Sequence, residues 1–218
     1  MTPDTYHTIA APSEGFFKDK GSKFYAYAFP VYTEEDWQER LAEVKKAHNK
    51  ARHHCFAWRL GLDGQQYRAN DDGEPSGTAG RPILGQIDSF ELTNVFVVVV
   101  RYFGGTLLGT SGLIQAYRES TAEAFRAADI VSRIVEDVFK IQFDYSLMSP
   151  VMQAVKKLDL EMISQDFGVT AYLTIAIRKS EVESSIHSLK AHVLGVREVE
   201  VEPGQEVAGL KIEFQYTR

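Results

Sequence analysis

A run of six apolar residues, Val95 to Val100, limits the folds open to this chain. Valine occupies every position of the run except Phe96, and a run this short and this apolar is typical of a buried strand in a sheet. A membrane-spanning helix would need about 20 consecutive apolar residues. We therefore predict a buried strand inside a folded domain.

Glycine-rich loops lie on either side of this strand. Asn70 to Pro82 reads NDDGEPSGTAGRP, and Arg101 opens the run RYFGGTLLGTSG. Loops rich in Gly, Ser, Thr and Asp beside a rigid strand can bring their backbone close to a ligand. We expect the working surface of the protein at these two loops.

The overall composition is ordinary for a folded protein. Of the 218 residues, 44% are hydrophobic, and the net charge is −6, whereas proteins that coat nucleic acid usually carry a basic excess. A local basic patch is still compatible with this charge. Cys55 is the single cysteine and the first residues carry no signal-peptide pattern, so we expect a cytoplasmic protein without a membrane span.

Local patterns predict an α+β protein with two domains, residues 1–132 and 133–218. After an irregular start, the first domain is expected to contain strands 14–20, 22–31, 51–60, 65–69 and 94–101 and helices 33–50, 78–87 and 111–129. Residues 130–135 read as a boundary. The second domain reads as the ferredoxin-like order βαββαβ, with strands 136–145, 160–165, 169–178 and 196–201 and helices from Ser149 and Ser180. Residues 210–214 fit one further strand.

The loop from Gly104 to Ser111 lies between a strand and a helix, as phosphate-binding loops do. Thr110 occupies the position where nucleoside triphosphatases carry lysine, so this chain lacks their phosphate-binding cation and is not such an enzyme. Backbone N–H groups at a helix start still favour an anion. We expect an anion site formed by Ser76, Thr78, Gly104, Gly105 and Thr110; the alternative is a tight turn that needs glycine only for its backbone.

Asp71, Asp72 and Glu74 crowd the first loop. Their oxygens suit a hard divalent cation, but the spacing of a calcium-binding loop is absent, so we predict neither a metal nor a cofactor. Two other interpretations stay open. The aspartates bond to backbone N–H groups of the turn, or Asp72 or Glu74 pairs with Arg81 or Arg101.

His53, His54 and Cys55 are consecutive on a predicted strand, so their side chains alternate between its faces. His53 and Cys55 share a face, which would place a thiol beside a base. Nucleophilic catalysis would also need an orienting third group and an oxyanion site, and the sequence identifies neither. We predict a core cysteine and no catalytic residue.

Arginines and aromatic residues alternate between the first helix and the second loop. Arginine binds phosphate bidentately and aromatic rings stack on bases, so this interval is a candidate RNA-contacting face. Ion pairing with nearby carboxylates is the alternative. The residues are Arg52, Arg59, Arg68, Arg81 and Arg101, with Trp58, Tyr67, Tyr102 and Phe103.

Three blocks of sequence resemble the YigZ/Impact family: ARHHCFAW from Ala51, DDGEPSGTAGRP from Asp71 and VVVVRYFGGTLLGTSGLIQAY from Val97. The resemblance implies a first domain like the second domain of a small-subunit ribosomal protein, and a ferredoxin-like second domain like the fifth domain of elongation factor G. It also implies work connected with translation. Ser111 and Gln115 depart from the glycine and the basic residue that the family commonly carries at these positions.

The expected function is a translation regulator that binds RNA or the ribosome and catalyses no reaction, with a regulatory protein as a further expected partner. The alternatives are an enzyme acting on a small anionic or phosphorylated substrate at the glycine loops, and a protein-interaction module. The expected RNA or anion contacts are Arg52, His53, His54, Ser76, Thr78, Arg81, Arg101, Gly104, Gly105 and Thr110. Asp71, Asp72 and Glu74 are expected to form a structural loop or an acidic site.

Overall fold

The structure, a computed structural model, describes residues 4–202 and 204–218. The chain divides into two compact units, Met1–Arg133 and Ile134–Arg218, called here the N-terminal and C-terminal units. The sequence patterns place this boundary after residue 132. Both units combine helices with sheets, which confirms the predicted α+β class. No helix in the described part of the chain is long and apolar enough to cross a membrane.

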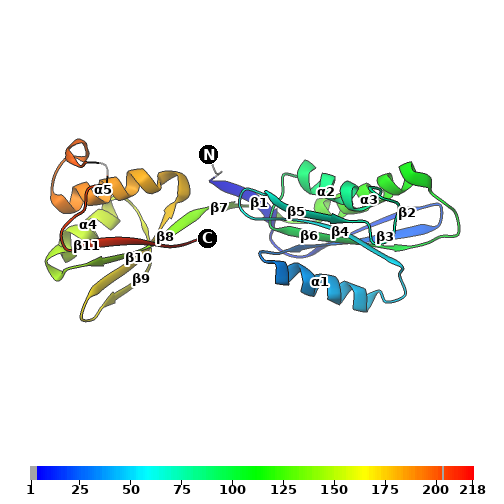
Figure 1. The fold of residues 1–218 in the computed structure, drawn as a ribbon, viewed down its shortest axis with the longest axis horizontal. Coiled ribbons are helices and arrows are strands. Elements are labelled where there is room, and N and C mark those ends of the chain that lie inside the picture. The colour runs from blue at the N-terminus through cyan, green and yellow to red at the C-terminus, as the bar shows by residue number, and fades with distance from the viewer. Residues whose placement is uncertain (1–3, 203) are drawn as a thin grey trace. The chain divides into compact units, whose positions relative to one another are not determined.

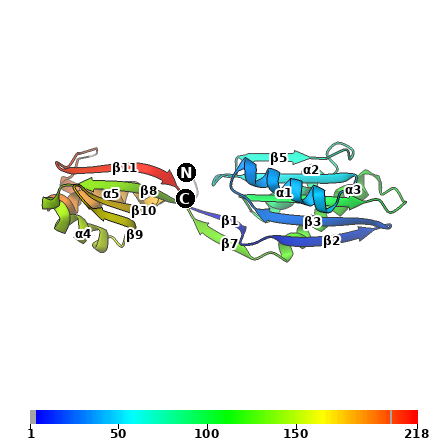
Figure 2. The same ribbon diagram turned by 90° about the horizontal axis from the view of Figure 1, so that it is seen from below.

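The N-terminal unit is built on a five-stranded antiparallel sheet (Figures 1 and 2). The predicted hairpin is confirmed, since Asp19 pairs with Ser22 across its turn. The predicted apolar strand, β6, lies at the centre of the sheet. In spatial order the strands are β2 Ser13–Asp19, β3 Ser22–Pro30, β6 Val95–Tyr102, β4 His53–Leu60 and β5 Gln66–Asn70.

Helices cover both faces of this sheet (Figure 1). α1, Glu34–Ala47, lies on one face, while α2, Gly80–Ser89, and α3, Gly109–Arg126, lie on the other. Side chains of β6 alternate between two cores: the odd-numbered valines pack with α2 and α3, and the even-numbered residues from Phe96 to Val100 pack with α1. A strand buried on both faces has no solvent side, which explains why its apolar run is continuous.

Two short strands outside the two main sheets are absent from the sequence-based prediction. β1, Thr5–Ile9, and β7, Ile130–Ile134, form a separate two-stranded sheet. The expected irregular start is therefore wrong, and the expected boundary segment is itself a strand. Each strand has only five residues, and pairing between segments so distant in the chain leaves no local signal in either of them.

The C-terminal unit has the predicted ferredoxin-like order. Its antiparallel sheet runs β11 Leu210–Thr217, β8 Glu136–Phe143, β10 Ala171–Arg178 and β9 Glu161–Phe167. Two helices, α4 Met148–Lys157 and α5 Val182–Leu194, share one apolar core with the sheet. The described part of the unit also contains the 3-10 turns η1 Tyr145–Leu147, η2 Lys179–Glu181 and η3 Glu198–Glu200.

The predicted closing strand at 196–201 is wrong. This segment contains the turn η3, and β11 closes the sheet instead. The Glu200 carboxylate accepts hydrogen bonds from the Arg197 backbone N–H at 2.9 Å and from its guanidinium at 2.7 Å, while Val199 is 85% exposed. Local side-chain hydrogen bonds of this kind compete with strand pairing. The valines of this segment therefore predict a strand, whereas the segment forms a turn.

Candidate functional site

Residues 70–82 contain Asp71, Asp72 and Glu74 and are called here the acidic loop; the first of these carboxylates caps a helix. The Asp71 carboxylate accepts hydrogen bonds from the backbone N–H groups of Gly77, Ala79 and Gly80, at 2.8, 3.0 and 2.8 Å. Burial alone would raise the pKa of Asp71, but the three donors outweigh this effect and the pKa lies below its usual value. Asp71 therefore stabilises the start of α2, where the helix dipole also favours a carboxylate.

Replacing Asp71 with asparagine is expected to destabilise the N-terminal unit by about 1–2 kcal/mol at pH 7, because an amide donor replaces one accepting oxygen. A carboxyl whose folded pKa is lowered stabilises the fold above its unfolded pKa, about 3.9, and loses this contribution as the pH falls through the folded pKa. The difference in unfolding free energy between wild type and variant, measured with urea, should shrink from pH 7 to pH 3. A difference that grows toward acid would contradict the capping role.

Asp72 connects the acidic loop to β4 through hydrogen bonds. Its carboxylate accepts the backbone N–H of His54 at 2.7 Å, and its carbonyl oxygen lies 2.9 Å from Nδ1 of His53. The His54 ring is buried, with Nε2 3.2 Å from the carbonyl oxygen of His48. Burial lowers the pKa of His54, so this ring is neutral at pH 7 and carries no charge for an anion.

Glu74 and Arg101 form an ion pair inside the N-terminal unit. The distance from Arg101 Nη1 to Glu74 Oε1 is 2.6 Å, and the side chains are 7% and 3% exposed, respectively. Tyr117 of α3 donates a further hydrogen bond to Glu74 Oε1 at 2.8 Å. The structure thus forms one of the pairings that the sequence left open, and this pairing joins the acidic loop, β6 and α3.

Cys55 belongs to the same buried network. Its Sγ lies 3.0 Å from the carbonyl oxygen of Asp71 and 3.2 Å from the hydroxyl of Tyr117, and the residue has no exposed surface. Burial raises the pKa of the Cys55 thiol, whereas a reactive cysteine needs a lowered pKa and access for its substrate. Cys55 is a core residue, as the sequence predicts.

The carboxylates of the acidic loop all accept hydrogen bonds from the protein itself. Within residues 4–202 and 204–218, no group of three or more His, Cys, Asp or Glu side chains is placed to hold a metal ion. Backbone N–H groups and the Arg101 guanidinium therefore supply donors to these carboxylates.

Gly104 packs against the turn between β2 and β3. A Cβ atom on Gly104 would lie 1.9 Å from the carbonyl carbon of Gly21 and 2.1 Å from the nitrogen of Ser22. The backbone N–H of Gly104 donates to Ser22 Oγ at 3.1 Å. Close packing of two backbones accounts for this glycine, which supports the turn interpretation at this position. Gly105 has a positive φ of 89°, and Thr110 is exposed in the first turn of α3.

Two adjoining cavities open beside the end of β6. One has a volume of about 410 Å³ and the other about 340 Å³. Tyr102 and Phe103 line both, so we treat them as one feature and call it the basic groove. The described residues that line it are Gly21, Lys23, Tyr25, Lys50, Ala51, Arg52, His53, Arg101, Tyr102 and Phe103.

Cations and aromatic rings dominate the basic groove. Lys23, Lys50 and Arg52 are exposed, and the lining contributed by the described residues contains no carboxylate. The Phe103 ring is 58% exposed, and the Arg101 guanidinium carbon lies 5.7 Å from its centre. The groove can therefore hold an anion beside a flat apolar surface, which is the combination that a nucleotide presents.

Three predicted contacts, Arg52, His53 and Arg101, line the basic groove. Lys23 and Lys50 also line it, and the sequence analysis missed both. Lys23 pairs with Tyr102 because β3 lies beside β6. Only the order of strands in the sheet could therefore have shown that Lys23 lies in the groove.

The other predicted contacts do not line the groove: His54, Ser76, Thr78, Arg81, Gly104, Gly105 and Thr110. Thr78 is buried, and its hydroxyl donates to the carbonyl oxygen of Pro75 at 2.7 Å. Arg81 is exposed in the first turn of α2. None of the residues expected to form the anion site lines the basic groove, whereas the exposed cations Lys23, Lys50 and Arg52 do.

Comparisons with known proteins match the resemblance seen in the sequence. The Impact N-terminal domain matches residues 20–125. An IMPACT family member from Haemophilus influenzae is 36% identical over 167 residues, which cover 76% of this chain and 81% of that protein. The family member YigZ from Escherichia coli is 35% identical over 144 residues, which cover 65% of this chain and 71% of that protein. A crystal structure of a hypothetical protein, 28% identical, has a TM-score of 0.67 and covers 96% of this chain and 97% of its own.

Proposed function

Since this chain belongs to the IMPACT family, we propose that it is a cytoplasmic regulator of translation that binds RNA or the ribosome and catalyses no reaction. The family resemblance implies domains like those of a ribosomal protein and of elongation factor G, which supports work connected with translation. One observation carries the binding proposal: the basic groove combines cations with aromatic surface, and its described lining has no carboxylate.

The chemistry of the groove fits RNA with unpaired bases. Arg52 can contact a phosphate bidentately, and the lysines can add charge along the backbone of the nucleic acid. The exposed ring of Phe103 offers a face on which a base can stack. Stacking requires a base that is not already paired within a duplex, so loops and junctions of ribosomal RNA are the expected targets.

The charge of the whole protein sets how this binding should depend on salt. With a net charge of −6, the protein has no general attraction for phosphate, and binding must depend on the few cations of the groove. Each contact with a single-stranded phosphate contributes about 0.7 to the slope of log affinity against log salt concentration. A shallow slope of a few units is therefore expected.

Replacing both Lys23 and Arg52 with alanine is expected to weaken RNA binding by at least about tenfold, because two charge-assisted contacts are lost. The salt slope should fall by about 1.4. Fluorescence anisotropy with a labelled RNA hairpin that has an unpaired loop measures both quantities, and co-sedimentation with ribosomal subunits tests the larger target. Both side chains are exposed, so the fold should not change.

The matched control replaces Arg118 and Arg133 with alanine. Both are exposed arginines of the N-terminal unit outside the groove lining, so this variant has the same change in net charge. It should bind RNA like the wild type. No salt-dependent binding to either target, or equal losses in the two double variants, would remove the support for an RNA-binding groove.

A further inference from the structure

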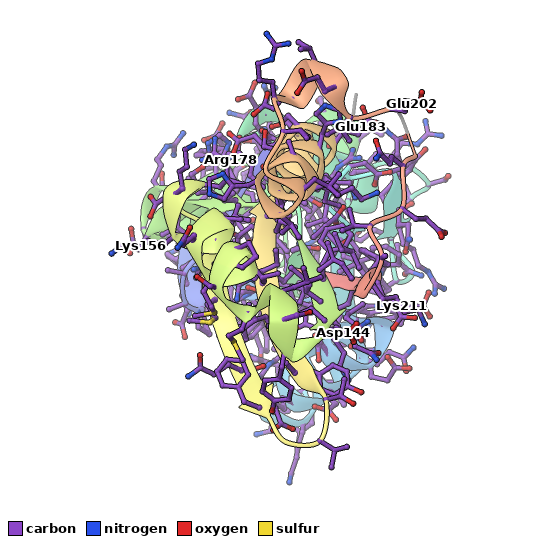
Figure 3. The ribbon with its side chains drawn as sticks, turned by 90° about the vertical axis from the view of Figure 1, so that its left-hand side faces the viewer. Asp144, Lys156, Arg178, Glu183, Glu202 and Lys211 are labelled. Atoms are coloured by element: carbon purple, nitrogen blue, oxygen red, sulfur yellow. The ribbon has the colours of Figure 1, made fainter. Side chains whose placement is uncertain are left out.

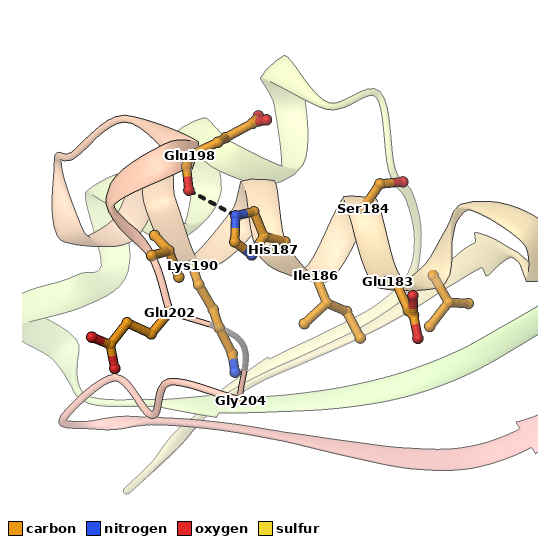
Figure 4. Close-up of a pocket in the computed structure, with 10 residues that line it drawn as sticks. Glu183, Ser184, Ile186, His187, Lys190, Glu198, Glu202 and Gly204 are labelled. Carbon is orange, nitrogen blue, oxygen red and sulfur yellow. Dashed lines mark hydrogen bonds between the residues drawn. The ribbon is translucent and has the colours of Figure 1, made fainter.

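A second cavity, in the C-terminal unit, has a chemistry opposite to that of the basic groove. It has a volume of about 650 Å³ and lies between α5 and the segment that follows η3 (Figure 4). One wall of the cavity comes from α5, and the other comes from Glu198, Val201, Glu202 and Gly204. We call this cavity the acidic pocket.

Part of the acidic pocket is apolar. Val182 and Ile186 are one helical turn apart on α5 and so lie on the same face, and Val201 contributes from the other wall. Val182 and Ile186 are half-buried, while Val201 is only 6% exposed. An aliphatic chain entering the pocket would therefore be removed from water on more than one side.

Three glutamates also line the pocket. Glu183 comes from α5, Glu198 from η3, and Glu202 from the segment after it. Both Glu183 and Glu202 lie near the upper edge in the view of Figure 3, whereas Figure 4 shows them on opposite sides of the pocket, with Lys190 between them. Among the described residues, none of the three glutamates forms an ion pair. The negative charge of the pocket is thus not balanced by a salt bridge.

The two basic side chains of the lining are directed to backbone oxygens. Lys190 Nζ donates to the carbonyl oxygen of Gln205 at 2.6 Å, and His187 Nε2 lies 2.8 Å from the carbonyl oxygen of Glu198 (Figure 4). The three glutamates and the one lysine of the lining sum to a formal charge of −2. A cation is the ligand that this lining favours, and phosphate is one that it repels.

We propose that the acidic pocket binds an arginine side chain from a basic segment of a partner protein. Arginine joins an aliphatic stem to a planar cation, so the stem can contact the apolar wall while the guanidinium pairs with a carboxylate. The surface beside the pocket favours a polypeptide over a free cation, because Val196 and Val199 are 41% and 85% exposed and offer apolar contact to neighbouring residues of a segment. This proposal is independent of RNA binding, which concerns the other unit.

Binding of a labelled peptide tests the proposal on the full chain. The probe is a fluorescein-labelled peptide with the core sequence Leu-Arg-Val-Arg-Leu, and its match has glutamine in place of each arginine. Fluorescence anisotropy should detect salt-sensitive binding of the arginine peptide and at least about tenfold weaker binding of the glutamine peptide. The variant Glu183→Gln with Glu202→Gln should weaken binding of the arginine peptide by a similar factor.

The control variant is Glu181→Gln with Glu206→Gln, since both residues are exposed, lie outside the pocket lining and give the same change in charge. It should bind the arginine peptide like the wild type, as should the groove variant Lys23→Ala with Arg52→Ala. No binding of the arginine peptide, equal binding of the two peptides, or equal weakening by the pocket and control variants would each overturn the proposal. RNA binding by the pocket variant should be unchanged. The RNA-binding proposal and the arginine-binding proposal can therefore be contradicted separately.

Discussion

Replacing Arg101 with methionine is expected to lower the unfolding free energy of the N-terminal unit by about 3–5 kcal/mol. Methionine keeps much of the apolar volume of the arginine stem but leaves the Glu74 carboxylate, 3% exposed, without its cation. Tyr117 still donates one hydrogen bond to Glu74, which is too little to compensate for a buried charge. Urea unfolding at pH 7, followed by tryptophan fluorescence, measures the change.

The matched variant removes both charges by replacing Glu74 with glutamine and Arg101 with methionine. A buried ion pair and its neutral replacement often differ little in stability, so the double variant should be less destabilised than Arg101→Met alone. If the two single changes add in the double variant, or if Arg101→Met costs less than about 1 kcal/mol, the pair does not stabilise the loop as described. Because a change at Arg101 destabilises the fold, RNA binding is better tested with variants of Lys23 and Arg52.

The sequence predicts the elements of the fold better than their partners in space. The run from Val95 to Val100 identifies β6 because burial on both faces removes the polar positions of an ordinary strand. The turn between β2 and β3 is formed by neighbouring residues, so the sequence predicts it equally well. Pairing of β1 with β7 depends on residues more than a hundred positions apart. The valines of residues 196–201 predict a strand, but this segment pairs with no strand of the sheet.

The candidate site shows the same limit at the level of side chains. Asp71, Asp72 and Glu74 are similar in sequence, yet one caps a helix, one holds β4 and one is buried against Arg101. These roles depend on which N–H groups and cations the fold places beside each carboxylate. The sequence alone therefore left the alternatives open. Lys23 lies almost 80 residues before Arg101 and reaches the groove only because β3 and β6 are neighbours.

Gly104 gives the second large effect expected here. Replacing it with alanine should destabilise the N-terminal unit by about 3 kcal/mol, because the new Cβ would overlap backbone atoms of Gly21 and Ser22 that no side-chain rotation can move. The β2–β3 turn would have to separate from the second glycine loop. The hydrogen bond from Gly104 N–H to Ser22 Oγ would then be lost as well.

Two other glycines separate this packing effect from backbone strain. Gly105→Ala meets no atom within 4 Å but places alanine at a φ of 89°, which should cost about 1–2 kcal/mol. Gly85→Ala, in α2, has open space and no positive φ, so it should be neutral or stabilise by up to about 1 kcal/mol. Urea unfolding should therefore rank Gly104→Ala as the most harmful and Gly85→Ala as the least. Equal losses at 104 and 105 would mean that the backbone conformation of the loop itself, and not its contact with the β2–β3 turn, requires glycine at both positions.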